Sequence, residues 1–133
     1  MAAYLFVYGT LRPVLRHPAF DKHLAGHIQY IDQARCPGRL LDLGAFPGLL
    51  PPADAGDQVV GDLLELPEDD EEALLQTLDT YEGPGFERTT KVVTLPQGTE
   101  VEAFVYTYEG PPGKGVAIQS GDWVRHQRAR QSS

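Results

Sequence analysis

A turn near the N-terminus has the residue types to bind a small anion or a carbonyl oxygen. It consists of Tyr8, Gly9, Thr10 and Leu11, at the end of an uncharged, β-prone run that begins at Tyr4. A buried strand that ends in Gly-Thr leaves backbone N–H groups without a ladder partner beside a hydroxyl group, an arrangement that can hold such a ligand. The same residues also fit a core strand followed by an ordinary connecting turn, so both interpretations stay open on this stretch alone.

Two glutamates are candidates for the polar group that this turn faces, because the tetrapeptide Tyr-Glu-Gly-Pro occurs at residues 81–84 and again at 108–111. Glu109 follows an alternating strand and enters a loop, where its side chain is free to point at solvent. Glu82 follows a predicted helix and precedes Gly85, so its neighbours fix the backbone around it. On positioning we prefer Glu82.

Other chemistry-bearing groups are few. Cys36 is the single cysteine, which excludes an internal disulfide and predicts a buried structural thiol. His23 and His27 have i, i+4 spacing, but no third ligand accompanies them and Gly26 interrupts the helix, so no metal site is expected. Lys114 lies in a Pro/Gly loop that lacks the spacing and the Ser/Thr of a phosphate-binding loop, and it does not indicate a nucleotide site.

The composition fits one globular domain. The 133 residues are 41% hydrophobic, the mean hydropathy is -0.29, and no apolar run approaches the length of a bilayer span. The formal net charge of -8 argues against nucleic-acid binding, which needs a positive surface. The chain enters its first strand without a basic leader segment, so the protein is expected to be cytoplasmic, with no membrane partner.

Mixed strand and helix patterns surround the candidate residues. Apolar and alternating runs predict strands, after the opening one, over 28–36, 39–43, 58–66, 88–95 and 100–108. Proline and glycine at the ends predict a helix over 18–25, and an acidic first turn with an apolar face predicts another over 68–80. The apolar residues of 44–52 predict a rigid loop, either as the wall of a pocket or packed against the sheet. Because no βα unit repeats, the pattern predicts an α+β domain over 1–125 with a curled or barrel-like mixed sheet around the opening strand. Residues 126–133 are expected to be a solvated, frayed polar tail.

Five short motifs together resemble the γ-glutamylcyclotransferase-like family. They are YGTLR at 8–12, FPGL at 46–49, LDTYEG at 78–83, FER at 86–88 and GDW at 121–123. Each motif alone is weak, but their order and distances are specific, and the resemblance extends from Tyr4 to Arg125. One departure is Phe86, where the family often has tyrosine.

The resemblance implies a small mixed β-barrel with flanking short helices and a cavity at its mouth. It implies that Tyr8, Gly9, Thr10 and Leu11 bind the γ-glutamyl part of a small γ-glutamyl compound, and that Glu82 is the catalytic general acid/base. The implied reaction is intramolecular: the α-amino group attacks the γ-carbonyl carbon and gives 5-oxoproline and a free amine. No metal, nucleotide or other cofactor is implied.

The chemistry of the two motifs suits this reaction. A carboxylate can take the proton of the α-ammonium group and return one to the departing amine, and shielding by Tyr81 and Phe86 is expected to raise the pKa of Glu82. The turn N–H groups can stabilise either the developing oxyanion or the substrate α-carboxylate. Tyr106 or Tyr108 could line the cavity, and a structural ion pair is expected for Arg88. The alternative to an enzyme is a non-catalytic binding or regulatory module that retains the pocket.

Overall fold

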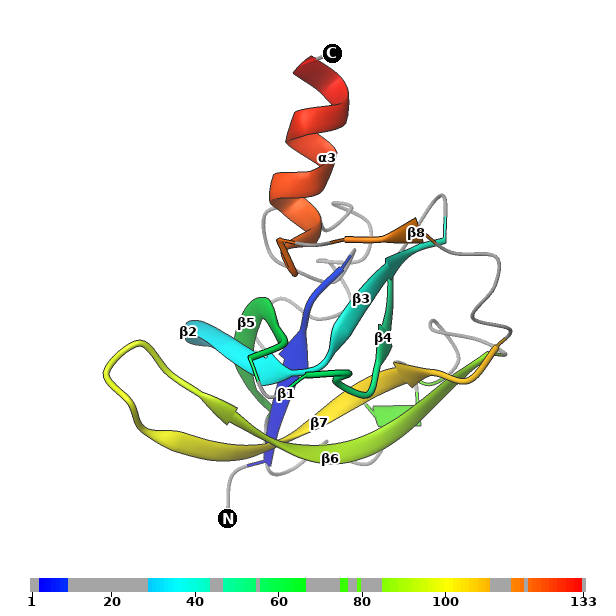
Figure 1. Cartoon of the computed structure of the whole chain (residues 1–133). Coiled ribbons are helices and arrows are strands. Elements are labelled where there is room, and N and C mark those ends of the chain that lie inside the picture. Colours follow the sequence, from blue (N-terminus) through cyan, green and yellow to red (C-terminus); the bar gives the residue numbers. More distant parts are fainter. Residues whose placement is uncertain are drawn as a thin grey trace.

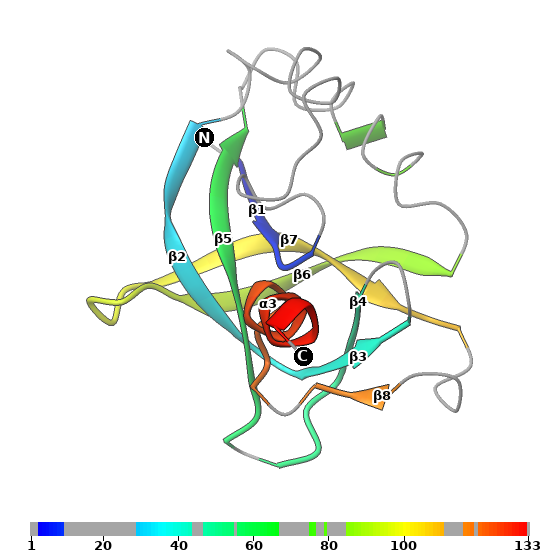
Figure 2. The same cartoon turned by 90° about the horizontal axis from the view of Figure 1, so that it is seen from above.

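The structure is a computed structural model, and it describes residues 3–9, 29–43, 47–54, 56–66, 75–76, 79, 85–110, 116–118 and 120–132 of the 133. Five strands close into a barrel (Figure 1 and Figure 2), as predicted. In barrel order they are β1 (Ala3–Val7), β5 (Gln58–Leu66), β2 (Gln29–Pro37), β6 (Phe86–Thr94) and β7 (Glu100–Tyr108). The predicted strand positions are therefore confirmed to within a few residues.

Strand β1 lies between two partners of opposite direction. It pairs antiparallel with β5, where Val7 lies opposite Asp62, and parallel with β7, where Leu5 lies opposite Phe104. The barrel therefore contains both parallel and antiparallel pairs, and both edges of β1 are paired. A strand fixed on both edges is a rigid support for the turn that follows it.

Both faces of β1 are buried, because its side chains alternate between two apolar clusters. Phe6 and Tyr8 belong to a cluster to which each of the four remaining barrel strands contributes side chains, among them Ala34, Val59, Val93 and Val105. Leu5 and Val7 face the other way, into a cluster with Leu64, Leu66, Leu75 and Tyr106. The first cluster therefore fills the barrel, and the second covers its outer surface. Each fully buried Leu or Phe stabilises the fold by about 1.5–3 kcal/mol.

A second, three-stranded sheet lies beside the barrel. Its order is β4 (Pro47–Leu50), β3 (Arg39–Asp42) and β8 (Val116–Ala117). The prediction of a continuous loop over 44–52 is therefore wrong at residues 47–50, which pair antiparallel with β3. Pro47 is tolerated because it is the first residue of a strand at the edge of the sheet.

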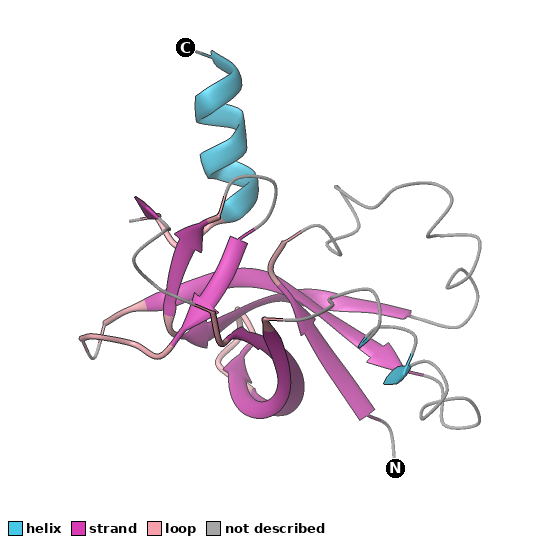
Figure 3. Ribbon diagram, turned by 90° about the vertical axis from the view of Figure 1, so that its right-hand side faces the viewer, coloured by secondary structure: helices cyan, strands magenta, loops and turns pink. Residues whose placement is uncertain are grey.

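Helix α3 (Trp123–Ser132) stands at one end of the barrel (Figure 3). Residues 126–132 are therefore helical, whereas composition predicted a frayed end. The predicted end of the domain at residue 125 stays a prediction. Asp122 caps the helix: one carboxylate oxygen accepts a hydrogen bond from the Arg125 N–H at 3.2 Å. Trp123 and Val124 are buried in its first turn. No helix in the described part of the chain has the length and apolar character to cross a membrane.

The two helices predicted earlier in the chain are described only in part. Residues 18–25 lie outside the described residues. Within 68–80, Leu75, Gln76 and Asp79 are described, and all three are helical. Leu75 is 6% exposed and packs on the outer face of the barrel beside Leu5 and Val7. This contact agrees with the predicted apolar face of the helix.

Candidate functional site

Tyr8 lies at the end of β1 and is 6% exposed. Its hydroxyl group donates a hydrogen bond to the Tyr106 carbonyl oxygen on β7. The same oxygen accepts a hydrogen bond from the Leu49 N–H on β4 at 3.3 Å. The side chain thus joins three strands, which is a structural role. The predicted contact of Tyr8 with a substrate stays a prediction.

Gly9 follows Tyr8 and is buried. A Cβ atom at this position would lie 2.8 Å from Pro47 Cγ and 2.9 Å from Pro47 Cδ, far inside van der Waals contact. The absence of a side chain therefore allows β1 to pass against the start of β4. Thr10 and Leu11, the other predicted substrate-binding residues, lie outside the described residues.

Glu82 also lies outside the described residues. Its nearest described neighbours along the chain, Asp79 and Gly85, are bonded to β7 and to the residue directly after β7. Asp79 Oδ1 accepts a hydrogen bond from the Tyr106 hydroxyl at 2.6 Å. The Gly85 carbonyl oxygen accepts one from the Glu109 N–H at 2.7 Å. Gly85 has a φ of 94°, in the left-handed region that glycine favours. The expected proximity of the turn and the Glu82 carboxylate stays a prediction.

Arg88 on β6 completes the surroundings of Asp79. Its Nη1 atom lies 3.5 Å from Asp79 Oδ2, so the expected structural ion pair is confirmed. Nη1 is buried and makes no hydrogen bond with the described residues, which identifies the 3.5 Å contact as an ion pair of imperfect geometry. The guanidinium carbon also lies 5.4 Å from the Phe104 ring centre, within cation–π distance.

Tyr106 and Tyr108, which sequence leaves undecided, have different surroundings. Tyr106 is 3% exposed and contacts both Tyr8 and Asp79. The Tyr108 ring packs on Phe86 with 5.6 Å between ring centres. Tyr106 is therefore the residue that connects the two parts of the candidate site. The one sequence signal for Asp79 is its place in LDTYEG, three residues before Glu82.

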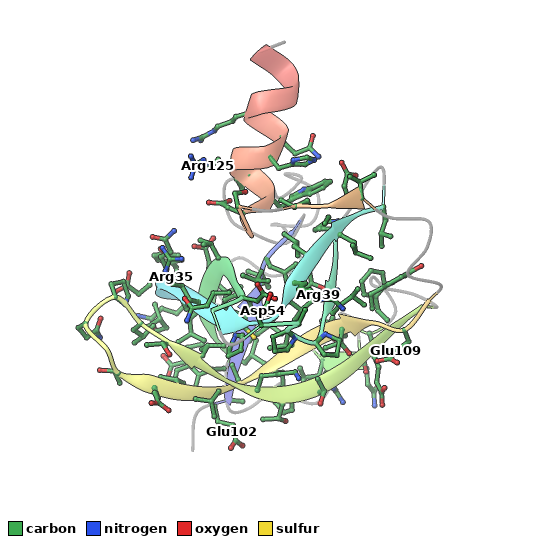
Figure 4. All side chains as sticks on the ribbon, in the orientation of Figure 1. Arg35, Arg39, Asp54, Glu102, Glu109 and Arg125 are labelled. Carbon is green, nitrogen blue, oxygen red and sulfur yellow. The ribbon has the colours of Figure 1, made fainter. Side chains whose placement is uncertain are left out.

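Glu109, the competing glutamate, is exposed, as expected (Figure 4). Its Oε1 atom accepts a hydrogen bond from the Thr107 hydroxyl at 3.1 Å. Its surroundings are those of a solvated surface carboxylate. Glu109 can therefore serve as a reference for experiments on Glu82.

Two surface cavities of about 490 and 440 Å³ lie elsewhere, and Arg35 and Gln58 line both. Arg39 and Asp54, seen with Arg35 in Figure 4, line the larger one. Neither cavity is lined by Tyr8, Gly9 or Tyr106, so neither belongs to the candidate site.

The described residues contain no group of three His, Cys, Asp or Glu side chains that could hold a metal ion. Cys36 is fully buried, as predicted. Burial raises the pKa of its thiol to about 11, so it is not a thiolate nucleophile near neutral pH.

A family model described as gamma-glutamyl cyclotransferase, AIG2-like, matches residues 5–125. The chain belongs to this family. The match spans most of the barrel, the second sheet and the start of α3. It includes every motif that carried the resemblance, and with the closed mixed barrel it confirms the predicted family and fold.

Several solved structures have a fold similar to that of this gamma-glutamyl cyclotransferase family member. YkqA from Bacillus subtilis is 28% identical with a TM-score of 0.76, over 100% of this chain and 44% of YkqA. An AIG2-like protein from Mus musculus is 23% identical with a TM-score of 0.73, over 92% and 88% of the two chains. A gamma-glutamyl cyclotransferase is 15% identical with a TM-score of 0.62, over 88% and 70%.

The present chain spans less than half the length of YkqA. The mouse protein and the gamma-glutamyl cyclotransferase are less than 25% identical to it, so they show the fold alone. No curated protein matches the sequence.

Proposed function

We propose that this protein is an enzyme of the γ-glutamylcyclotransferase type, which converts a γ-glutamyl amine or γ-glutamyl amino acid into 5-oxoproline and a free amine. The observation that carries the proposal is the family match over residues 5–125. The attachment of both Tyr8 and Asp79 to Tyr106 supports it, because these residues belong to the two motifs assigned to binding and catalysis.

Glu82 acts as general acid and base in this proposal. Its carboxylate accepts a proton from the α-ammonium group, and the freed amino nitrogen attacks the γ-carbonyl carbon. A new C–N bond forms, the γ-carbon to amine bond breaks, and Glu82 returns a proton to the departing nitrogen. In total the α-nitrogen loses two protons and the departing nitrogen gains two, so the reaction needs no water and no cosubstrate.

The turn of Tyr8, Gly9, Thr10 and Leu11 holds the γ-glutamyl group. One N–H donor to an oxyanion typically contributes about 3–4 kcal/mol to catalysis. The nucleophile and the electrophile belong to one molecule, so holding the substrate folded back on itself supplies a further part of the rate enhancement.

Replacing Glu82 tests the proposal. The wild-type protein and the Glu82→Gln variant are incubated with a panel of γ-glutamyl compounds, and 5-oxoproline is measured by mass spectrometry. General acid/base catalysis typically contributes about 10²–10⁴-fold, so the variant should be slower by that factor.

Glu109→Gln is the matched control, because it makes the same change in the second Tyr-Glu-Gly-Pro sequence at an exposed position. It should keep wild-type activity. Undiminished release of 5-oxoproline by Glu82→Gln would contradict the role of Glu82. Tight binding without product in the wild type would instead favour the binding module, and glutamate as the product would indicate hydrolysis.

A further inference from the structure

Tyr106 makes two different hydrogen bonds, one with its backbone and one with its side chain. Its carbonyl oxygen accepts from the Tyr8 hydroxyl, and its own hydroxyl donates to Asp79 Oδ1 at 2.6 Å. Tyr8 begins the substrate turn, and Asp79 precedes Glu82 by three residues. One residue of β7 is therefore bonded to both motifs of the proposed site.

The Asp79 carboxylate is held from two adjacent strands. Arg88 on β6 lies directly opposite Tyr106 on β7 in the strand register. Tyr106 contacts one carboxylate oxygen of Asp79, and the Arg88 guanidinium lies near the other. Phe104, two residues before Tyr106, stacks against the guanidinium. Each carboxylate oxygen of Asp79 therefore has a partner on a different strand, and the shorter contact is the hydrogen bond from Tyr106.

Anchoring Asp79 restricts the chain that follows it. Glu82 is three residues beyond Asp79 and three before Gly85, whose carbonyl oxygen is bonded to the Glu109 N–H directly after β7. Three residues span at most about 11 Å, so two fixed ends limit the range of positions open to the residue between them. A displacement of about 1 Å at a reacting group can lower a rate about 100-fold.

We propose that Tyr106 is a positioning residue for the reaction proposed above. Its hydroxyl group holds Asp79, and thereby the segment that carries Glu82, while its carbonyl oxygen holds Tyr8 and thereby the substrate turn. The inference rests on the proposed function for its catalytic consequence. The hydrogen bonds of Tyr106 to Asp79 and Tyr8 do not depend on that function.

Tyr106→Phe tests the side-chain half of this role, because it removes one hydroxyl group and keeps the ring and the backbone bond to Tyr8. The loss of a hydrogen bond to a charged group predicts a fall in kcat of about 10–100-fold. KM should change less than about 3-fold, since the turn is unaffected. A general loss of folded protein would instead lower the active fraction without this selective effect on kcat, so the active fraction is titrated and thermal unfolding is recorded for each variant.

Asp79 variants provide the coupling test. Asp79→Ala should be at least as slow as Tyr106→Phe, because it also removes the ion pair with Arg88. The double variant should be no slower than Asp79→Ala, because both changes remove the same hydrogen bond. Asp79→Asn keeps an oxygen acceptor for the tyrosine hydroxyl and should recover most of the activity. Tyr30→Phe is the control, since it removes the hydroxyl of a tyrosine that is 51% exposed on β2.

Amide hydrogen exchange gives a readout that does not depend on turnover. The peptide from Asp79 to Gly85 should exchange faster in Tyr106→Phe than in the wild type. Wild-type kcat in Tyr106→Phe, multiplicative losses in the double variant, or unchanged exchange would each overturn the inference. If the wild type releases no 5-oxoproline, the proposed function fails, and the exchange measurement alone decides whether Tyr106 anchors the segment.

Discussion

Cys36 shows how burial removes a residue from chemistry. Its side chain is fully buried on β2, within the cluster that fills the barrel. Desolvation raises the pKa of the thiol from 9.0 to about 11, and Lys91 offsets only part of this effect. The neutral thiol therefore behaves as a small apolar side chain.

Cys36 should make the free energy of unfolding depend on pH in the alkaline range. The folded-state pKa lies above the unfolded value, so the stabilisation is complete below pH 9.0 and is lost as the pH rises toward about 11. Between about pH 8 and about pH 10.5 the free energy of unfolding should fall by about 2 kcal/mol more in the wild type than in Cys36→Ala. Urea unfolding at the two pH values measures the difference.

Alkylation provides the control for that measurement. Iodoacetamide should modify Cys36 in the unfolded protein and react far more slowly with the native protein near neutral pH. Rapid labelling of the native thiol, or equal pH dependence in both proteins, would show that the thiol is accessible.

Single residues also mark the limit of reading this site from sequence. The role of Tyr8 in substrate binding, which the resemblance implies, stays a prediction, but the hydrogen bonds of its hydroxyl group to backbone groups of Tyr106 and Leu49 were not predicted. These partners are distant in the chain, so no local pattern predicts them. Asp79 lies in a quoted motif, but its role appears only once β6 and β7 place Arg88 and Tyr106 beside it.

At the level of elements, β1 and β4 can approach each other because the residue at their contact is glycine, which has no side chain. A Cβ atom on Gly9 would clash with the Pro47 ring, and a Cβ atom on Gly48 would clash with the Tyr108 side chain. The FPGL motif therefore has a packing role in the described structure: it brings the edge strand β4 against the end of β1 and against β7.

Gly9→Ala should disturb this contact. Overpacking typically costs about 1–3 kcal/mol, so the melting temperature should fall by several degrees, and turnover should fall as the turn is displaced. Gly56→Ala is the matched control, because its Cβ atom would meet nothing within 4 Å. Thermal unfolding and 5-oxoproline release of both variants measure the effect. Equal stability of the two variants would show that Pro47 yields without cost.

Sequence predicted some elements well and others poorly, for physical reasons. The alternation of Leu5 and Phe6 correctly assigned the two faces of β1, because a two-residue period is enforced along a strand. Strand β4 was missed because proline and glycine weaken the strand pattern and only edge pairing with β3 compensates. Helix α3 was missed because its sequence is polar, and its position depends on Asp122 and Trp123 at its first turn.

At the scale of the whole molecule, the start of α3 closes one end of the barrel. Trp123 is 2% exposed and belongs to the cluster that fills the barrel. His126 Nε2 lies 2.8 Å from Asp42 Oδ2, which ties the helix to β3 of the second sheet. A backbone hydrogen bond also joins the segment before α3 to β5, since the Gly121 carbonyl oxygen accepts from the Val60 N–H at 2.7 Å.

Two changes near the C-terminus should therefore differ in effect. Trp123→Ala should lower the free energy of unfolding by about 3–5 kcal/mol, because it opens a cavity in the barrel. Deletion of residues 127–133, which keeps Trp123 and His126, should cost much less. Urea unfolding of the two proteins compares them. A larger loss from the deletion would place the domain boundary beyond the predicted residue 125.

The parallel pairing of β1 with β7 has a consequence for synthesis of the chain. Leu5 is synthesised long before its register partner Phe104, which lies far along the sequence from it. Contacts so distant in sequence form slowly, and here the partner strand must first leave the ribosome. Once β5 has paired with β1, the other edge of this apolar strand stays unpaired until β7 emerges, and an unpaired apolar edge exposes the nascent protein to aggregation.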